Sequence, residues 1–281
     1  VLSEYTNAIP ILIKAVEIAD KLGDRSKYLH LVAIRNLGNA YYAVENYDKA
    51  LPVYKQGESI SKGLYGKSNL GHVYALRRLG ETSYAMKNYS EANFYFTAAV
   101  KIHKIQDHIN SAKYLALITW LGHVNYASAN YLEAESYYLE AIQIHKNQKD
   151  IHSASYVDLL NNLGNAKYAG SDYQGGESTY RSAMKILVEN NQENNSGMTA
   201  SLMGIANSLT AQNKYSDAEK FLLKAIMLKK TNNGQDPRYA TMLSSLASLY
   251  YGMGAQHKAE DILLEVIALQ VTNPFINKGD S

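Results

Sequence analysis

Two histidines, His103 and His145, are the first candidates for chemistry in this sequence. They lie 42 residues apart, each in an Ile-His-Lys context, and imidazole is a common zinc ligand. Helix packing argues against a shared metal, because packed helices are about 8–10 Å apart whereas zinc ligands lie about 2 Å from the ion. We therefore predict no metal site, and we interpret both side chains as cations near helix C-termini, where the helix dipole favours them.

No other residues have the spacing of a catalytic or cofactor-binding motif. The sequence contains no phosphate-binding glycine loop, no Gly-x-Ser-x-Gly turn and no His-Glu-x-x-His helix. Glu133 and Glu135 are two residues apart on a predicted helix, which directs them to different faces. The chain has no cysteine, so disulfides, thiolate catalysis and Cys-based metal centres are excluded. We predict that the protein is not an enzyme and binds no cofactor.

The composition narrows the choice of partner. The chain has 28 Lys and Arg against 26 Asp and Glu, a formal net charge of +2, and this balance favours neither nucleic acid nor an anionic membrane surface. No apolar run approaches the roughly 18–20 residues that a membrane span needs, and no signal peptide opens the chain. We therefore expect a cytoplasmic protein without membrane insertion, and the absence of cysteine is compatible with that location.

An internal repeat determines where the structural elements lie. Tyrosines recur at intervals of 42 residues: Tyr5, Tyr47, Tyr89, Tyr131, Tyr173 and Tyr215. A small residue follows each of them by three places, and a Leu-Gly pair precedes the second to the fifth by ten places. Five identical intervals do not arise by chance, so the chain is a tandem repeat.

Each unit is predicted to form two amphipathic helices. Leu76, Leu79 and Ser83 recur at intervals of three and four residues, as one face of a helix does. Asn88 offers an N-cap for a second helix that begins at Tyr89. Small residues are expected where helices cross, because only they let two backbones approach closely. Neither helix can bury its apolar face alone, so neighbouring units must stack into a solenoid.

The repeat resembles a known family. The tetratricopeptide (TPR) signature is closely matched by Asn36-Leu37-Gly38-Asn39-Ala40-Tyr41-Tyr42 and Tyr47-Asp48-Lys49-Ala50, and the match recurs over essentially the whole chain. The 42-residue unit looks like the lengthened one of kinesin light chains and nephrocystin-3-like proteins. The resemblance implies an all-α, right-handed superhelical solenoid of antiparallel helix pairs with about 6.5 repeats. It does not extend to the His-Pro-Asp linker of kinesin light chains, since the chain has Gln235-Asp236-Pro237 there.

With this repeat, the chain divides into a half repeat, six full repeats and a tail or linker at 271–281. The repeat boundaries are 1–23, 24–65, 66–107, 108–149, 150–191, 192–232 and 233–270. The half repeat is a second helix without its partner, and the chain does not begin with Met, so we expect a segment of a longer protein. Pro10 and Pro52 lie about six residues into second helices and should distort or delay them.

The family resemblance also implies which residues line the inside of the superhelix. It places the second, fifth, ninth and twelfth positions of each first helix on the concave wall. These positions vary between repeats while core positions stay similar, as a specific extended ligand would require. The candidate residues for binding a protein or peptide are Arg35, Asn39, Tyr42, Arg77, Glu81, Tyr84, Thr119, His123, Tyr126, Asn161, Asn165, Tyr168, Met203 and Asn207. For the tyrosines in this set, packing is the alternative role.

Four asparagines carry the most specific hypothesis: Asn39, Asn161, Asn165 and Asn207. An asparagine amide is both donor and acceptor, so it can pair with the N–H and C=O of a peptide unit whatever the side chain. At about 10 Å apart, such residues match about three residues of an extended chain at about 3.3 Å each. TPR proteins that bind peptides often use such a ladder. The alternative is that these asparagines are solvated on an unused face.

The expected function is that of a non-catalytic scaffold or adaptor that holds an extended peptide or partner segment in the concave groove. Arg35, Arg77 and Arg78 at one end would favour an acidic or C-terminal carboxylate group. Two alternatives stay open: a sensing or regulatory arm of a larger multidomain enzyme of protease-like or NTPase type, and self-association. Trp120, the only tryptophan, suits a ligand anchor and a packing residue equally well.

Overall fold

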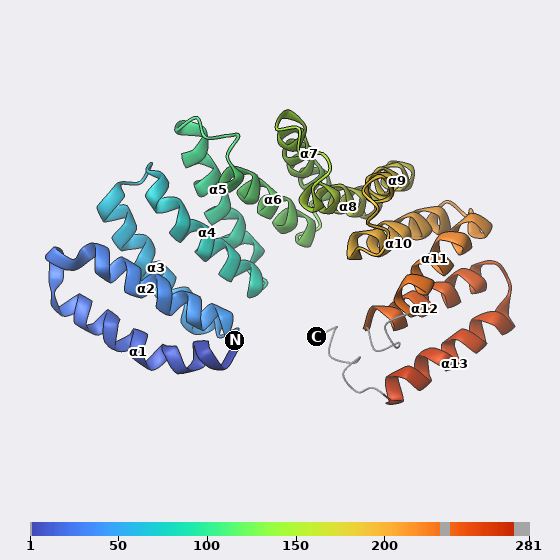
Figure 1. Ribbon diagram of the computed structural model, residues 1–281, viewed down its shortest axis with the longest axis horizontal. Coiled ribbons are helices and arrows are strands. Elements are labelled where there is room, and N and C mark those ends of the chain that lie inside the picture. The colour runs from blue at the N-terminus through green and yellow to red at the C-terminus, as the bar shows by residue number, and fades with distance from the viewer. Residues whose placement is uncertain (1, 231–236, 273–281) are drawn as a thin grey trace. The chain divides into compact units, whose positions relative to one another are not determined.

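The computed structural model describes residues 2–230 and 237–272, and these form an all-α protein with no strand (Figure 1). One short 3-10 helix, Gly23–Ser26, follows the first of thirteen α-helices in the described residues. The α-helices are α1 (Leu2–Lys21), α2 (Lys27–Ala43), α3 (Tyr47–Tyr65), α4 (Leu70–Ala85), α5 (Tyr89–Ile105), α6 (Ala112–Ala127), α7 (Tyr131–Asn147), α8 (Ala154–Ala169), α9 (Tyr173–Glu189), α10 (Ser196–Ala211), α11 (Tyr215–Lys230), α12 (Pro237–Gly252) and α13 (Gln256–Thr272). The predicted tail at 271–281 lies almost wholly outside the described residues.

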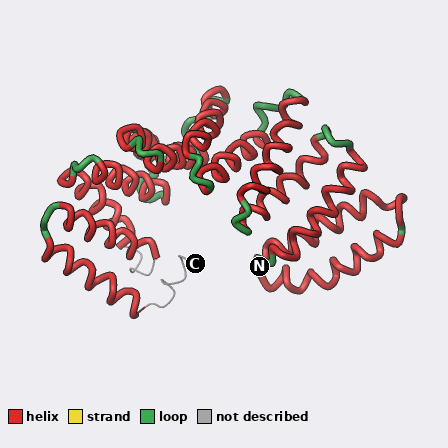
Figure 2. Tube along the Cα trace, turned by 180° about the vertical axis from the view of Figure 1, so that it is seen from behind, coloured by secondary structure: helices red, strands yellow, loops and turns green. Residues whose placement is uncertain are grey.

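The chain divides into two compact units, one up to Tyr137 and one from Tyr138. Helices α1 to α6 pack in succession within the first unit, and helices α8 to α13 pack in succession within the second. Short connections join the helices (Figure 2). A single helix followed by six pairs confirms the predicted solenoid of about 6.5 repeats.

Side-chain caps start the second helix at the same place in three of the repeats. Asn88 Oδ1 accepts the backbone N–H of Glu91 at 3.3 Å, which confirms the predicted N-cap. Asn46 and Asp172 cap α3 and α9 in the same way. Because the cap and the buried Tyr54 hold α3 in place, Pro52 does not delay the helix, which begins at Tyr47 in register with the other repeats. The expectation of a delay at this proline was wrong.

The turns between first and second helices share one backbone geometry. After α4, Lys87 has φ 61° and is followed by Asn88, whose N–H donates to Ser83 O at 2.8 Å. Together with the bond from Lys87 N to Tyr84 O at 2.9 Å, this is a Schellman motif. The same left-handed position recurs once in every other full repeat, at Glu45, Ala129, Ser171, Asn213 and Gly254. This turn therefore sets the direction from which each second helix packs back on the first.

Glycines on the first helices receive aromatic rings from the second helices. A Cβ added at Gly80 would lie 2.8 Å from the Phe96 ring, and one added at Gly164 would lie 2.6 Å from Tyr180. Two backbones do approach at the small residue of the second helix, where a Cβ on Gly176 would meet the Gly164 carbonyl oxygen at 3.3 Å. The expectation that small residues allow close backbones therefore holds at that position, whereas the Leu-Gly glycines make room for a ring.

Candidate functional site

The first unit carries a cluster of arginines around one tyrosine. The guanidinium carbons of Arg35 and Arg77 lie 5.6 and 5.7 Å from the centre of the Tyr74 ring, which is within the range of cation–π attraction. The Tyr74 hydroxyl donates to Asn39 Oδ1 at 3.0 Å. Arg35 and Asn39 come from α2, and Tyr74 and Arg77 come from α4, so the cluster joins neighbouring first helices.

A buried carboxylate holds the arginines of α4. Glu81 is 4% exposed, and its Oε1 accepts from Arg77 Nη1 at 2.7 Å while its Oε2 accepts from Arg78 Nη1 at 2.5 Å. Arg78 also donates to the Tyr54 hydroxyl oxygen from Nε at 2.9 Å and from Nη2 at 2.6 Å. Burial raises the pKa of Tyr54, so its hydroxyl keeps the proton that it donates to Asn39 Oδ1 at 2.8 Å. Of the predicted residues here, Arg78 and Glu81 are thus occupied by internal bonds.

A pocket of about 340 Å³ lies beside this cluster, between α4 and α6. Tyr74 and Arg77 line it from α4, and Lys113, Ala116 and Leu117 line it from α6. Tyr74 stands at the second position of its first helix, which the family resemblance placed on the concave wall, whereas Lys113 was not among the predicted residues. An aromatic stands at this position where the neighbouring repeats have Val32 and Ala116.

In two of the four ladder asparagines, the side-chain amide oxygen accepts hydrogen bonds from tyrosines. Asn165 Oδ1 accepts from the Tyr180 hydroxyl at 2.6 Å, and Asn39 Oδ1 accepts from Tyr54 and Tyr74. These bonds use the carbonyl oxygen of each amide. The Nδ2 groups of Asn39 and Asn165 have no hydrogen-bond partner in the described part of the chain. Each asparagine therefore keeps a free donor.

The other two ladder asparagines differ in whether their side-chain amides are hydrogen-bonded. Asn161 is 6% exposed, with Nδ2 donating to Gly197 O at 3.3 Å and Oδ1 accepting from Ser201 Oγ at 2.8 Å. Its amide therefore ties α8 to α10. Asn207 on α10 is half-buried, and among the described residues its side chain forms no hydrogen bond, because Leu222 stands where a tyrosine would meet it. Met203, one turn earlier on α10, is half-buried as well.

The tyrosines at the twelfth position pack against the tyrosines that begin the second helices. The ring centres are 5.3 Å apart for Tyr42 and Tyr47 and 5.5 Å apart for Tyr84 and Tyr89. The remaining pairs are Tyr126 with Tyr131 at 5.7 Å and Tyr168 with Tyr173 at 5.4 Å. Burial raises the pKa of Tyr42, Tyr84 and Tyr126. These rings fix the angle between the two helices of a repeat.

Of the predicted residues of α6, His123 contacts the tryptophan. Trp120 stacks on Phe96 with 5.5 Å between ring centres and an interplanar angle of 8°, and it meets Tyr84 and His123 edge to face. Burial lowers the pKa of His123, which favours the neutral imidazole. Thr119 Oγ1 donates to Leu115 O at 2.8 Å. Trp120 therefore packs into the first unit, the role that the sequence had left open.

The histidines considered first lie in the interior. His103 is 1% exposed and faces the Tyr114 ring, and His145 is 2% exposed and faces the Tyr156 ring. Burial lowers the pKa of His103, so the interpretation of this residue as a helix-end cation was wrong. Among the described residues, no group of three or more His, Asp or Glu side chains is arranged to hold a metal ion. No helix in the described ranges combines the length and the apolar character needed to cross a bilayer.

Sequence comparison identifies the family. A profile described as Tetratricopeptide repeat matches residues 2–63 and 33–105, and a second profile of the same description matches residues 199–238. Together with the helix pairs and the 42-residue spacing, these matches show that the chain belongs to the tetratricopeptide repeat family. Domains of this family typically bind proteins and are generally non-catalytic. No curated protein matches the chain.

Several solved structures have a similar fold. BtubC (BKLC) from P. vanneervenii has a TM-score of 0.68 and 18% identity, over 82% of this chain and 92% of that one. A putative kinesin light chain from Podosopora anserina, with nearly identical TPR-like repeats, has a TM-score of 0.64 and 18% identity, over 71% and 95%. A Rap protein complexed with Competence and Sporulation Factor has a TM-score of 0.62 and 16% identity, over 96% and 76%. At these identities the likeness is one of fold.

Proposed function

We propose that the chain is a non-catalytic module that binds an extended acidic segment of a partner protein along its first helices. The observation that carries the proposal is the Arg35–Tyr74–Arg77 cluster beside the pocket between α4 and α6. A preformed surface of this kind binds with less ordering of its own side chains. The similar fold of a Rap protein complexed with a factor supports the use of such an array for binding.

The charge of the cluster favours an acidic ligand. Arg35, Arg77 and Lys113 present cationic groups at or near the pocket, and the carboxylate beside them, Glu81, is buried and already bonded to two arginines. Arg35 and Lys113 form no ion pair with any described residue. A guanidinium has five N–H donors in a planar fork, so Arg77 can bond a carboxylate while it holds Glu81.

Within each unit, asparagines would bind the backbone of an extended ligand. The free Nδ2 donors of Asn39 and Asn165, and the whole amide of Asn207, suit the carbonyl groups of an extended peptide. The amide of Asn161 is already satisfied on both sides. In the second unit the predicted ladder therefore narrows to Asn165 and Asn207, while Asn39 belongs to the arginine cluster of the first unit.

Fluorescence anisotropy tests this proposal. The probe is a labelled unstructured peptide of Asp, Glu, Gly and Ser with a free C-terminal carboxylate, and the full chain is the titrant. We expect Arg35→Ala to weaken binding about five- to tenfold, the loss of roughly one cation contact. The control is Lys185→Ala, an exposed cation on the second helix α9. The proposal is refuted if the wild type does not bind the peptide, or if the wild type and the variants bind it with equal affinity.

A further inference from the structure

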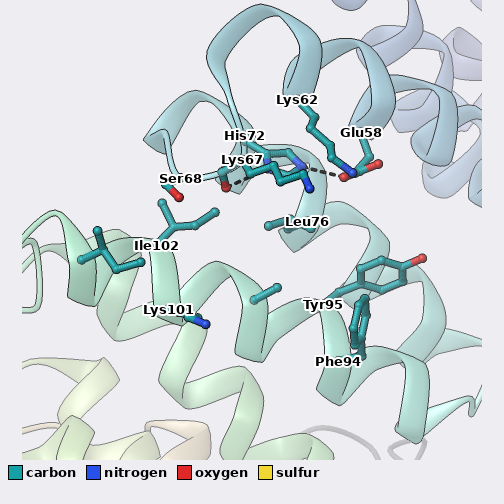
Figure 3. Close-up of a pocket in the computed structure, with 12 residues that line it drawn as sticks. Glu58, Lys62, Lys67, Ser68, His72, Leu76, Phe94, Tyr95, Lys101 and Ile102 are labelled. Carbon is teal, nitrogen blue, oxygen red and sulfur yellow. Dashed lines mark hydrogen bonds and ion pairs between the residues drawn. The ribbon is translucent and has the colours of Figure 1, made fainter.

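A second concave site lies between α3 and α5, with α4 as its floor (Figure 3). Its volume is about 550 Å³. His72 and Leu76 reach it from α4, whereas Tyr74 and Arg77 of the same helix line the pocket toward α6. We call this site the α3–α5 groove, and it is separate from the surface considered above.

The walls of the α3–α5 groove expose apolar side chains. Phe94 is 66% exposed and Ile105 is 59% exposed, both on α5. Leu76 and Ile102 lie below them and are buried. An apolar strip of this kind on the surface of a folded chain is typical of an interaction site when charged residues border it.

The border of the groove is positively charged. Lys62, Lys67 and Lys101 line it, and none of the three forms an ion pair with a residue that the structure describes. The carboxylate in the lining, Glu58, is bonded through Oε1 to His72 Nε2 at 2.8 Å. The groove therefore offers three unpaired ammonium groups around an apolar strip.

The turn that carries two of these polar residues is held in place. Lys67 O lies 3.4 Å from His72 Nδ1, and Ser68 O accepts from Gln106 Nε2 at 3.0 Å. The first contact fixes the turn to α4 and the second fixes it to the end of α5. One edge of the groove is thus formed before a partner arrives, which lowers the entropy lost on binding.

The repeat shows that these exposed residues are not needed for the scaffold. The buried Ile102 has isoleucine at the equivalent place in three other repeats, Ile60, Ile144 and Ile186. The exposed residues have no such counterparts. The places equivalent to Phe94 hold Pro52, Ser136, Ser178 and Lys220, and those equivalent to Ile105 hold Gly63, Asn147 and Glu189. The wall is thus particular to this one repeat, while the floor is common to the array.

We propose that the α3–α5 groove binds an acidic protein segment that carries apolar side chains. The apolar side chains would cover Phe94 and Ile105, and the carboxylates would pair with Lys62, Lys67 and Lys101. Charge complementarity selects this partner, because the lining has three free cations and its only carboxylate is bonded to His72. The site stands independently of the function proposed for the first helices.

The test uses a labelled peptide of alternating Glu with Leu and Phe, titrated with the full chain and read by fluorescence anisotropy. We expect micromolar binding that weakens at high salt, since part of the attraction is between exposed charges. Phe94→Ser introduces the residue that two other repeats carry, and Lys101→Glu reverses a charge on the groove. We expect each variant to lower the affinity at least tenfold.

A matched control defines the site. Lys185→Glu reverses the lysine at the position equivalent to Lys101 two repeats later. We expect this variant to bind the peptide as the wild type does. The proposal is overturned if the wild type does not bind, if Phe94→Ser and Lys101→Glu bind normally, or if Lys185→Glu lowers the affinity as much as Lys101→Glu does. Equal binding of a second peptide, in which Lys replaces each Glu, would overturn it as well.

Discussion

The hydroxyl of Tyr180 donates to Oδ1 of Asn165 at 2.6 Å, and three repeats earlier Tyr54 makes the same bond to Asn39 at 2.8 Å. The bond joins the second helix of a repeat to the ninth position of the first. An asparagine at this position therefore has a structural partner whenever a tyrosine stands fifteen residues later. Leu222 stands there in the repeat of Asn207, which leaves that amide for other contacts.

Replacing Asn165 tests this relationship. Asn165→Ala leaves the partly buried Tyr180 hydroxyl without its acceptor, and we expect the free energy of unfolding to fall by about 1–2 kcal/mol. The matched control is Asn207→Ala, which removes no hydrogen bond and should change stability by less than about 0.5 kcal/mol. Urea denaturation measures both. Equal losses in the two variants would show that the tyrosine bond contributes nothing.

The pairing of glycine with an aromatic ring predicts a coupled substitution. Gly80→Ala places a Cβ about 2.8 Å from the Phe96 ring, and we expect a loss of about 1–3 kcal/mol from overpacking. Another repeat in the chain has Ala206 with Leu222 at these two places. Phe96→Leu should therefore rescue Gly80→Ala. We expect the free energy of unfolding lost by the double variant to be smaller, by about 1 kcal/mol or more, than the sum of the losses in the two single variants. Strictly additive losses would contradict this explanation.

The left-handed turn residues predict stabilising substitutions. Glu45, Lys87 and Ala129 have φ of 58°, 61° and 59°, a conformation that costs a residue with a Cβ about 1–2 kcal/mol. Glycine adopts it freely, and the last repeat already has Gly254 in this place with φ 75°. We expect each change to glycine to raise the free energy of unfolding by about 0.5–1 kcal/mol. The control is Ala116→Gly inside α6, for which we expect the opposite effect, a free energy of unfolding lower by about 1 kcal/mol.

The bonds of the Glu177 carboxylate predict that the free energy of unfolding depends on pH. Glu177 accepts from Arg181 Nε at 2.8 Å and from Gln212 Nε2 at 3.0 Å. Burial alone would raise the pKa of Glu177, but the bonds with Arg181 and Gln212 outweigh it and lower the pKa below its usual range. Since the folded pKa lies below the unfolded value of about 4.3, the stabilisation is complete above about pH 4.3 and is lost as the pH falls through the folded value.

We therefore expect Glu177→Gln to be less stable than the wild type at about pH 7, and the difference to shrink as the pH falls below about 4.3. Denaturant unfolding at a series of pH values measures this difference. Glu189→Gln serves as the control, because Glu189 is 48% exposed and lies 3.8 Å from its partner Lys185. A gap between wild type and Glu177→Gln that does not change with pH would argue against the lowered pKa.

The sequence by itself determined the helices and their pairing. The interval between tyrosines, the caps such as Asn88 and the small residues of each unit act over a few positions, so the sequence alone reveals them. The repeated first-helix positions could also be predicted, because a residue's place in the repeat sets its place on the helix.

Only the tertiary structure decided which of those polar groups are free. Asn161 is satisfied by Gly197 and Ser201, which lie 36 and 40 residues later in the chain. Likewise Arg78 is held by Tyr54, 24 residues earlier. The α3–α5 groove depends on how three helices meet, and no interval within one repeat marks it. Such contacts depend on the side chains that a neighbouring helix brings to each place, so periodicity alone does not predict them.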